Sequence, residues 1–254
     1  WGAYYSKFAV MIGVGAALCL FSVSAMTGRI RNAYDRAEYR LMRERLGHAV
    51  SRLSIVAFPA AVYLAALADA IVKCLYKGET ETAVSWIQKG TVIIVLCCFA
   101  FFFAQLLYRM HMIRELLLSV LVSLVIHIVM AYLFVQKALL GADGIIYALI
   151  AYFAVFAVLN FLFLSRNLKY RQNWLSGVAF PLAAAVVSGI AVILIGKIML
   201  EPAGAVATIL TGIAAGIFLY VTMLMILRVI GEEELSRIPL GFFFIMFGKN
   251  IGVL

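Results

Sequence analysis

The sequence predicts an all-α membrane protein, a polytopic helix bundle with about seven transmembrane helices. Composition is the first indication: 66% of the 254 residues are hydrophobic, only 13% are charged, and the mean hydropathy is +1.08. A soluble domain of ordinary composition carries about 25% charged residues. The other indications are a series of apolar stretches of membrane-crossing length and the gathering of basic residues in every second gap between them.

Seven stretches are long enough to cross the membrane, because a helix needs about 20 apolar residues to span roughly 30 Å of hydrocarbon. Each is bounded by more polar residues, which separate it from the next. The seven stretches are Phe8–Met26, Leu53–Val72, Thr91–Leu107, Leu116–Val135, Gly144–Leu164, Val178–Ile195 and Gly204–Leu227.

Lysine and arginine residues are distributed unequally between the two sides of these spans. One side carries Lys7, Lys73, Lys77, Lys89, Lys137 and Lys197. The remaining basic residues lie in the 27–52, 108–115 and 165–177 gaps and in the tail after Leu227. By the positive-inside rule the richer side is cytoplasmic, so we expect the N-terminus of the chain outside the cytoplasmic membrane and its C-terminus in the cytoplasm. Placed in this way, the net charge of +9 indicates contact with the lipid bilayer and not with nucleic acid.

The 27–52 gap is the most basic of these segments and is not a plain linker. Apolar residues recur in it near helical spacing, at Ile30, Ala33, Ala37, Leu41 and Leu46. This pattern predicts a cytoplasmic interfacial helix. One interpretation is an anchor on anionic lipid head groups. The other is a contact for the anionic head group of a substrate at the cytoplasmic gate.

Lys7 is the first candidate substrate-binding residue. It stands at the outer edge of the first span, behind Tyr4 and Tyr5. A lysine in this place either snorkels out of an aromatic belt or faces a water-filled cavity, where ionisable groups within a membrane are usually functional.

His127, near the middle of the fourth span, is the second candidate. Glu115, Ser119, Ser123 and His127 recur every four residues and therefore lie along one ridge of the helix. Polar groups in hydrocarbon must face protein or water, so this ridge is expected to point into the bundle. It either packs against neighbouring helices or forms the polar wall of a transport pathway.

Two further patterns concern packing. Asp69 and Lys73 are four residues apart at the exit of the second span, in the order that favours an ion pair. A stripe of small residues in the last span predicts close backbone approach to the Val178–Ile195 helix. Its members are Gly204, Thr208, Gly212 and Gly216.

No motif of covalent chemistry is present: there is no phosphate-binding P-loop, no HExxH helix, no serine elbow and no carboxylate cluster within a span. The four cysteines have neither metal-ligand spacing nor a paired framework. We therefore expect a protein that is not an enzyme, with no catalytic residue, no metal and no cofactor. The chain also begins at Trp1, immediately before its first span, so we expect a C-terminal piece of a longer protein.

Four segments resemble the C-terminal half of the MurJ and stage V sporulation protein B type flippases, members of the multidrug/oligosaccharidyl-lipid/polysaccharide exporter superfamily. WGAYYSK (1–7) resembles the opening of the eighth helix of that family, and FPAAVYLAALADAIVKCLYKG (58–78) resembles its ninth. LLGADGIIYALIAYFAVFAVLN (139–160) is similar to the entry to the twelfth helix, and GEEELSRIPLG (231–241) to the segment that closes sporulation-type members. The chain departs from the family in the eighth helix, where Met11–Val14 and Met26–Arg29 lack the usual prolines.

The resemblance implies helices eight to fourteen of a fourteen-helix transporter that works by alternating access. Residues 1–165 would form most of the C-terminal lobe, with five transmembrane helices and the basic cytoplasmic interfacial segment 27–52. Residues 166–230 would form two extra transmembrane helices, and 231–254 a cytoplasmic amphipathic tail. The implied partners are the lipid bilayer, the missing N-terminal half and an undecaprenyl-linked anionic substrate carrying a saccharide or a peptidoglycan precursor. Lys7 falls where the family carries its eighth-helix cation.

Two other functions stay open on the sequence. One is a drug/cation antiporter of the same superfamily, which would use membrane carboxylates for coupling to Na⁺ or H⁺. Asp69, Glu115 and Asp143 all lie at span ends, which disfavours it. The other is a non-transporting scaffold in an envelope or sporulation complex.

Overall fold

The computed structural model describes residues 2–76, 81–231, 236 and 241–251. Within these ranges the chain forms helices and no strand, and six of the helices are long and apolar enough to cross a membrane. This confirms the all-α fold class, and the six helices are consistent with a multi-pass membrane protein. In chain order the elements are α1 (Gly2–Asp35), α2 (Tyr39–Ala66), α3 (Ala68–Leu75), α4 (Glu81–Arg109), α5 (Ile113–Tyr132), the π-helix η1 (Leu133–Lys137), α6 (Ala142–Leu168), the π-helix η2 (Leu175–Ala179), α7 (Phe180–Ile226) and α9 (Gly241–Ile251).

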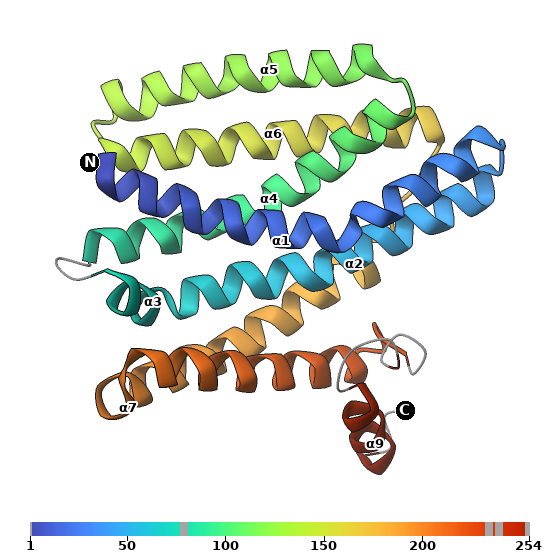
Figure 1. The fold of residues 1–254 in the computed structure, drawn as a ribbon. Helices are drawn as coiled ribbons and strands as arrows, with labels where there is room; N and C mark the ends of the chain where they lie inside the picture. Colours follow the sequence, from blue (N-terminus) through green and yellow to red (C-terminus); the bar gives the residue numbers. More distant parts are fainter. Residues whose placement is uncertain (1, 77–80, 232–235, 237–240, 252–254) are drawn as a thin grey trace.

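The long helices lie side by side in an elongated bundle, and each runs opposite to the one before it (Figure 1). Helix α4 is central, in contact with α1, α2 and α6. Helix α5 lies at one edge and packs on α6, whereas α7 lies at the other edge and packs on α2 and α3. The main core is therefore formed by α1, α2, α4 and α6, with α5 and α7 added on either side.

Helix α7 contains two of the predicted spans. Its apolar stretch, Leu175–Ile226, is 52 residues long, which as a straight helix would extend about 78 Å, more than twice the hydrocarbon thickness. At Gly204 the backbone leaves the helical region, with φ +79° and ψ 168°, and the chain doubles back (Figure 1). A positive φ is a conformation that glycine adopts without strain. The described ranges thus contain six candidate membrane helices where the sequence predicted seven spans, and the predicted spans Val178–Ile195 and Gly204–Leu227 fall in the one apolar stretch that doubles back at Gly204.

The 27–52 segment differs from its prediction. It is not a separate interfacial helix, because α1 continues to Asp35 and α2 begins at Tyr39. The reversal between them contains Ala37, whose φ of +58° ends the helical path. Ile30 and Leu46 are fully buried. The helical periodicity was correct, but its apolar residues pack in the core between the two arms of a helical hairpin.

The predicted span Leu53–Val72 contains two departures from a regular helix, at Pro59 and at Leu67. Pro59 lies inside α2 and has no N–H to donate to the carbonyl of Ile55, four residues earlier. The hydroxyl of Tyr220, from the second arm of α7, donates to that carbonyl at 3.0 Å, which satisfies a group that would be costly to leave unpaired in hydrocarbon. The predicted span Leu53–Val72 is also divided at Leu67, where α2 gives way to α3.

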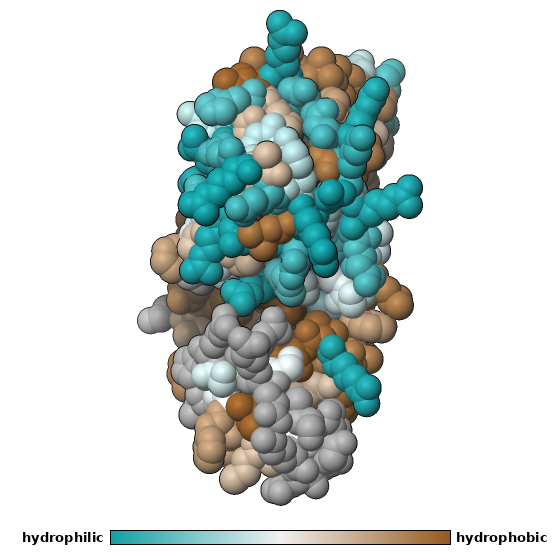
Figure 2. Space-filling view, turned by 90° about the vertical axis from the view of Figure 1, so that its right-hand side faces the viewer, coloured by the Kyte–Doolittle hydropathy of each residue, from teal (hydrophilic) through white to brown (hydrophobic). Residues whose placement is uncertain are grey.

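The basic gaps meet at one end of the bundle, here called the arginine-rich end. The α1–α2, α4–α5 and α6–α7 connections and the end of α7 all lie there (Figure 1). Figure 2 shows this end, where hydrophilic residues cover the upper and middle parts. The segment 231–254, predicted as an amphipathic tail, contains the helix α9, whose Phe244 lies against Phe218 of α7 with ring centroids 5.9 Å apart.

Candidate functional site

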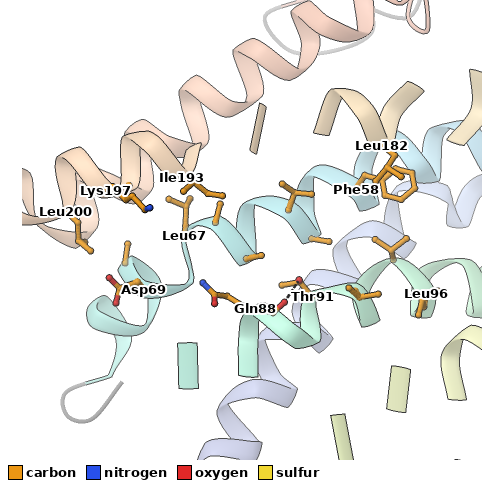
Figure 3. Close-up of a pocket in the computed structure, with 18 residues that line it drawn as sticks. Phe58, Leu67, Asp69, Gln88, Thr91, Leu96, Leu182, Ile193, Lys197 and Leu200 are labelled. Atoms are coloured by element: carbon orange, nitrogen blue, oxygen red, sulfur yellow. Dashed lines mark hydrogen bonds between the residues drawn. The ribbon is translucent and has the colours of Figure 1, made fainter. Parts of the chain in front are cut away.

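A cavity of about 700 Å³ lies between α2 and α3, α4 and the first arm of α7 (Figure 3). Eighteen side chains or backbone segments line it, and most are aliphatic or aromatic. Phe58, Leu96 and Leu182 lie toward one end, and Asp69, Gln88 and Lys197 toward the other (Figure 3). The cavity is therefore apolar along most of its length and polar at the end that lies away from the arginine-rich end.

The interruption at Leu67 shapes the polar end. It starts the short helix α3, whose first turn carries Asp69. Asp69 Oδ2 accepts a hydrogen bond from Lys73 Nζ at 2.9 Å, which confirms the predicted ion pair. Lys197, across the cavity on α7, has no ion-pair or hydrogen-bond partner within the described ranges and is exposed. This end can offer an anion one ammonium group whose charge is not neutralised locally.

Tyr63 of α2 makes polar contacts with both arms of α7. The hydroxyl of Tyr63 donates to the carbonyl of Gly216, in the second arm of α7, at 2.6 Å. It also lies 2.9 Å from the hydroxyl of Ser188 in the first arm. Both arms of the hairpin are thus tied to the same residue of α2.

Glycines allow this close approach, as the small-residue stripe predicted. A Cβ at Gly216 would lie 2.7 Å from Val192 and 2.9 Å from the ring of Tyr63, and a Cβ at Gly212 would lie 3.0 Å from Leu67. Contact with the first arm through Val192 confirms the prediction, and contact with α2 extends it. Gly204 serves a different purpose, because it forms the turn and nothing lies within 4 Å of its Cβ position.

The polar ridge of α5 faces α6. Ser119 and Ser123 are fully buried, which confirms that the ridge points into the bundle. Ser119 donates to Asn160 Oδ1 at 2.6 Å. The carbonyl of Ala148 lies 3.1 Å from Nδ1 of His127 and can only accept, so this nitrogen carries the proton. The arrangement favours the interpretation of the ridge as helix packing.

The two candidate substrate-binding residues are not brought together with the cavity. His127 is half-buried between α5 and α6, edge-on to the ring of Tyr152, with centroids 5.8 Å apart. It does not line the cavity. Lys7 belongs to α1, and its side chain lies outside the part of the chain whose side chains are described.

Sequence reasoning missed Gln88, Thr91 and Lys197 as residues of one site. Each is a single polar residue at the edge of an apolar stretch, which is also the usual place for a residue of no special role. The useful signal was the lysine at 197, a charge in the short connection between two closely spaced spans. Only the packing of α2 and α4 against α7 shows that the three share a cavity.

The described part of the chain contains no group of three His, Cys, Asp or Glu residues that could hold a metal ion. The fold is a bundle with six helices long and apolar enough to cross a membrane, and it encloses a cavity that is apolar along most of its length and polar at one end. Comparison with models of protein families, with curated proteins and with solved structures finds no match.

Proposed function

We propose that this chain is part of a transporter that flips a lipid-linked saccharide or peptidoglycan precursor across the cytoplasmic membrane. In this proposal the two arms of α7 cross separately, so that the chain has seven crossings. The N-terminus lies outside, and the arginine-rich end is cytoplasmic. The local resemblance to the MurJ and stage V sporulation protein B type flippases supports the proposal, and so does the gathering of basic residues at one end of the bundle.

The cavity between α2, α4 and α7 is the observation that carries the proposal. A lipid-linked substrate needs an apolar surface for its hydrocarbon chain and a polar, cationic place for its head group, because a charged head group does not enter hydrocarbon unaided. The cavity combines an apolar length with Lys197, Gln88 and Asp69 at one end. We propose that it holds part of the hydrocarbon chain of the substrate.

The transport path itself would lie between this lobe and an N-terminal half, and Lys7 would contact the anionic head group there. His127 has a smaller part in the proposal, because its hydrogen bond to Ala148 places it in the α5–α6 interface. The protein would carry out no covalent chemistry, and its partners would be the bilayer, the N-terminal half and the undecaprenyl-linked substrate.

The cavity can be tested by filling it. Gly196 lines the cavity, and nothing lies within 4 Å of its Cβ position, so Gly196→Trp should occupy the space without displacing a neighbour. We expect at least a tenfold loss of flipping of a fluorescent lipid-linked substrate by the complete protein in proteoliposomes. The matched control is Ala183→Trp, which adds the same ring to an exposed position of the same arm outside the cavity.

Equal flipping by wild type, Gly196→Trp and Ala183→Trp would remove the cavity from the proposal. No flipping by the wild-type protein would refute transport of this substrate class and leave the antiporter and the scaffold. Lys7 is tested in the same assay: Lys7→Glu should abolish flipping, whereas Lys7→Arg should keep much of it. Normal flipping by Lys7→Glu would assign Lys7 to the aromatic belt.

A further inference from the structure

The arginine-rich end contains a second cavity, of about 550 Å³, that the proposed transport path does not use. Its walls are the first half of α2, the connection 170–173 with η2, and residues 228–229 after α7. Four arginines line it: Arg43, Arg52, Arg171 and Arg228. Along α2 it lies at the end opposite to Asp69, so the two cavities are separate.

The charge of this arginine cavity is poorly compensated. Among the described residues that line it, Glu44 is the one carboxylate. The ion pairs found in the described ranges lie elsewhere, and none includes any of the four arginines. Within the described ranges, Arg43 donates to backbone carbonyls at 3.1 Å and 3.5 Å, and the polar contact found for Arg52 is with a sulfur atom at 4.0 Å. Several guanidinium donors therefore remain available to a ligand.

The turn at the end of α7 positions Arg228 at the arginine cavity. Helix α7 ends in a turn in which the N–H of Val229 bonds the carbonyl of Leu224 at 2.9 Å. Within that turn Arg228 adopts φ +52°, the left-handed conformation in which many helices end and which Ala37, His111 and Lys169 also adopt at helix ends of this chain. The same turn with glycine would be unstrained, but it would place no cation at the cavity.

The opposite wall also has an unusual backbone. Ser176 and Gly177 belong to the π-helix η2, a helix type found frequently at functional sites. A Cβ at Gly177 would approach Nε2 of Gln172 to 2.3 Å, so the amide of Gln172 packs directly against this glycine. The buried hydroxyl of Tyr170 donates to Gln172. Neutral donors and acceptors thus stand beside the arginines.

We propose that the arginine cavity binds a phosphate group. Arginine presents a planar fork of N–H donors that matches two phosphate oxygens, and a charge-assisted pair of this kind is about twice as strong as a neutral hydrogen bond. The described lining of the cavity contains four such groups and one carboxylate, so its positive charge exceeds what is needed to neutralise a phosphate mono- or dianion. Basic pockets of this kind between transmembrane helices bind lipid head groups, and a soluble phosphate has the same chemistry. This site would be independent of the flipping path.

The experiment measures thermal unfolding of the 254-residue chain in detergent with two probes. The first probe is dioleoylphosphatidylglycerol, compared with dioleoylphosphatidylcholine. The second is sodium phosphate, compared with sodium chloride at equal ionic strength. A ligand that binds the folded state raises the melting temperature, and the rise grows with the logarithm of the ratio of ligand concentration to Kd. Stabilisation by the lipid alone identifies a head-group site, and stabilisation by phosphate alone identifies a soluble phosphate.

The test variant is Arg171→Gln with Arg228→Gln, which removes two cations from the cavity. The matched control is Arg36→Gln with Arg40→Gln, which removes the same charge from exposed positions at the same end, outside the cavity. We expect at least a tenfold weaker apparent affinity for the stabilising probe in the test variant and wild-type affinity in the control. The general salting effect of phosphate is equal in all three proteins and cancels.

A test variant that fails to fold is replaced by Ser176→Glu, which adds a carboxylate to the cavity at an exposed position and keeps all four arginines. This variant should weaken the apparent affinity for the stabilising probe by a similar factor. Equal weakening in the test and control variants would overturn the proposal and assign the effect to the general charge of this end. Absence of stabilisation of the wild-type chain by either probe would also overturn it.

Discussion

Helices α4 and α5 are nearly equal in hydropathy and opposite in environment. Their most apolar windows have mean hydropathies of 2.4 and 2.6, yet 67% of the window is buried in α4 and only 11% in α5. Helix α4 is surrounded by α1, α2 and α6, whereas α5 contacts α6 and little else. Hydropathy therefore identifies a helix that can enter a membrane, but it does not say whether the helix faces protein or lipid.

The difference lies in where the polar residues sit. In α5, Ser119 and Ser123 are fully buried while Leu121, between them, is 60% exposed. This is the reverse of a soluble amphipathic helix, and it is expected where the solvent is hydrocarbon and the polar groups bind a neighbouring helix. In α4 large apolar side chains are buried on several sides, including Phe102 and Leu106. Packing of this kind depends on shape, which a hydropathy value does not contain.

Truncation of a core ring in α4 should give the largest effect. Phe102 is fully buried, so Phe102→Ala should lower the free energy of unfolding by about 3 kcal/mol, because the surrounding helices cannot close the space. The control Leu121→Ala in α5 should change it by less than about 0.5 kcal/mol, as at other exposed positions. Equilibrium unfolding of the chain in mixed micelles measures both. Equal losses would mean that α5 is packed against protein on its outer face as well.

The polar contact that holds α5 in place should give an intermediate effect. Asn160 of α6 is fully buried, accepts the hydrogen bond of Ser119 and donates to the carbonyl of Ala100 in α4 at 3.4 Å. Asn160→Ala should cost about 1–2 kcal/mol, a typical value for an interhelical hydrogen bond whose partners are left in an apolar medium. The same unfolding experiment applies, with the exposed Val158→Ala on the same helix as control. A loss in Asn160→Ala no greater than in Val158→Ala would show that this polar contact does not hold α5 in place.

His127 should give the smallest effect. Its hydrogen bond to Ala148 is half-buried, and interhelical bonds of this kind average about 0.6 kcal/mol. His127→Leu should therefore lower stability by no more than this and leave flipping unchanged. Unchanged stability together with lost flipping would return His127 to the list of substrate-binding residues and place α5 beside a transport path.

The sequence predicts the helical fold well because length and hydropathy decide whether a segment can be a membrane helix, and both are local properties. It also places the basic gaps at one end correctly, since that follows from alternation. The sequence does not predict the places where a single backbone angle ends a helix or reverses the chain. Ala37 and Gly204 both adopt positive φ, and nothing in the surrounding residues distinguishes Ala37 from a helical alanine.

The candidate site was less predictable than the fold. The predicted ion pair between Asp69 and Lys73 is confirmed, because a contact within one turn of a helix depends only on local spacing. The residues that share a cavity with Asp69 come from α4 and α7, at positions such as Gln88 and Lys197. Their proximity depends on how helices far apart in the sequence pack together. A single sequence carries no direct record of that packing.

The hydroxyl of Tyr63, which holds both arms of α7, has a mechanical consequence. A displacement of α7 relative to α2 must break the bond to Gly216 and separate Tyr63 from Ser188, in a medium that offers no water to replace them. The hairpin of α7 is therefore mechanically coupled to α2 through Tyr63. Movement of α2 would carry both arms of α7 with it, and α2 and the first arm would move together relative to α4, the third wall of the cavity.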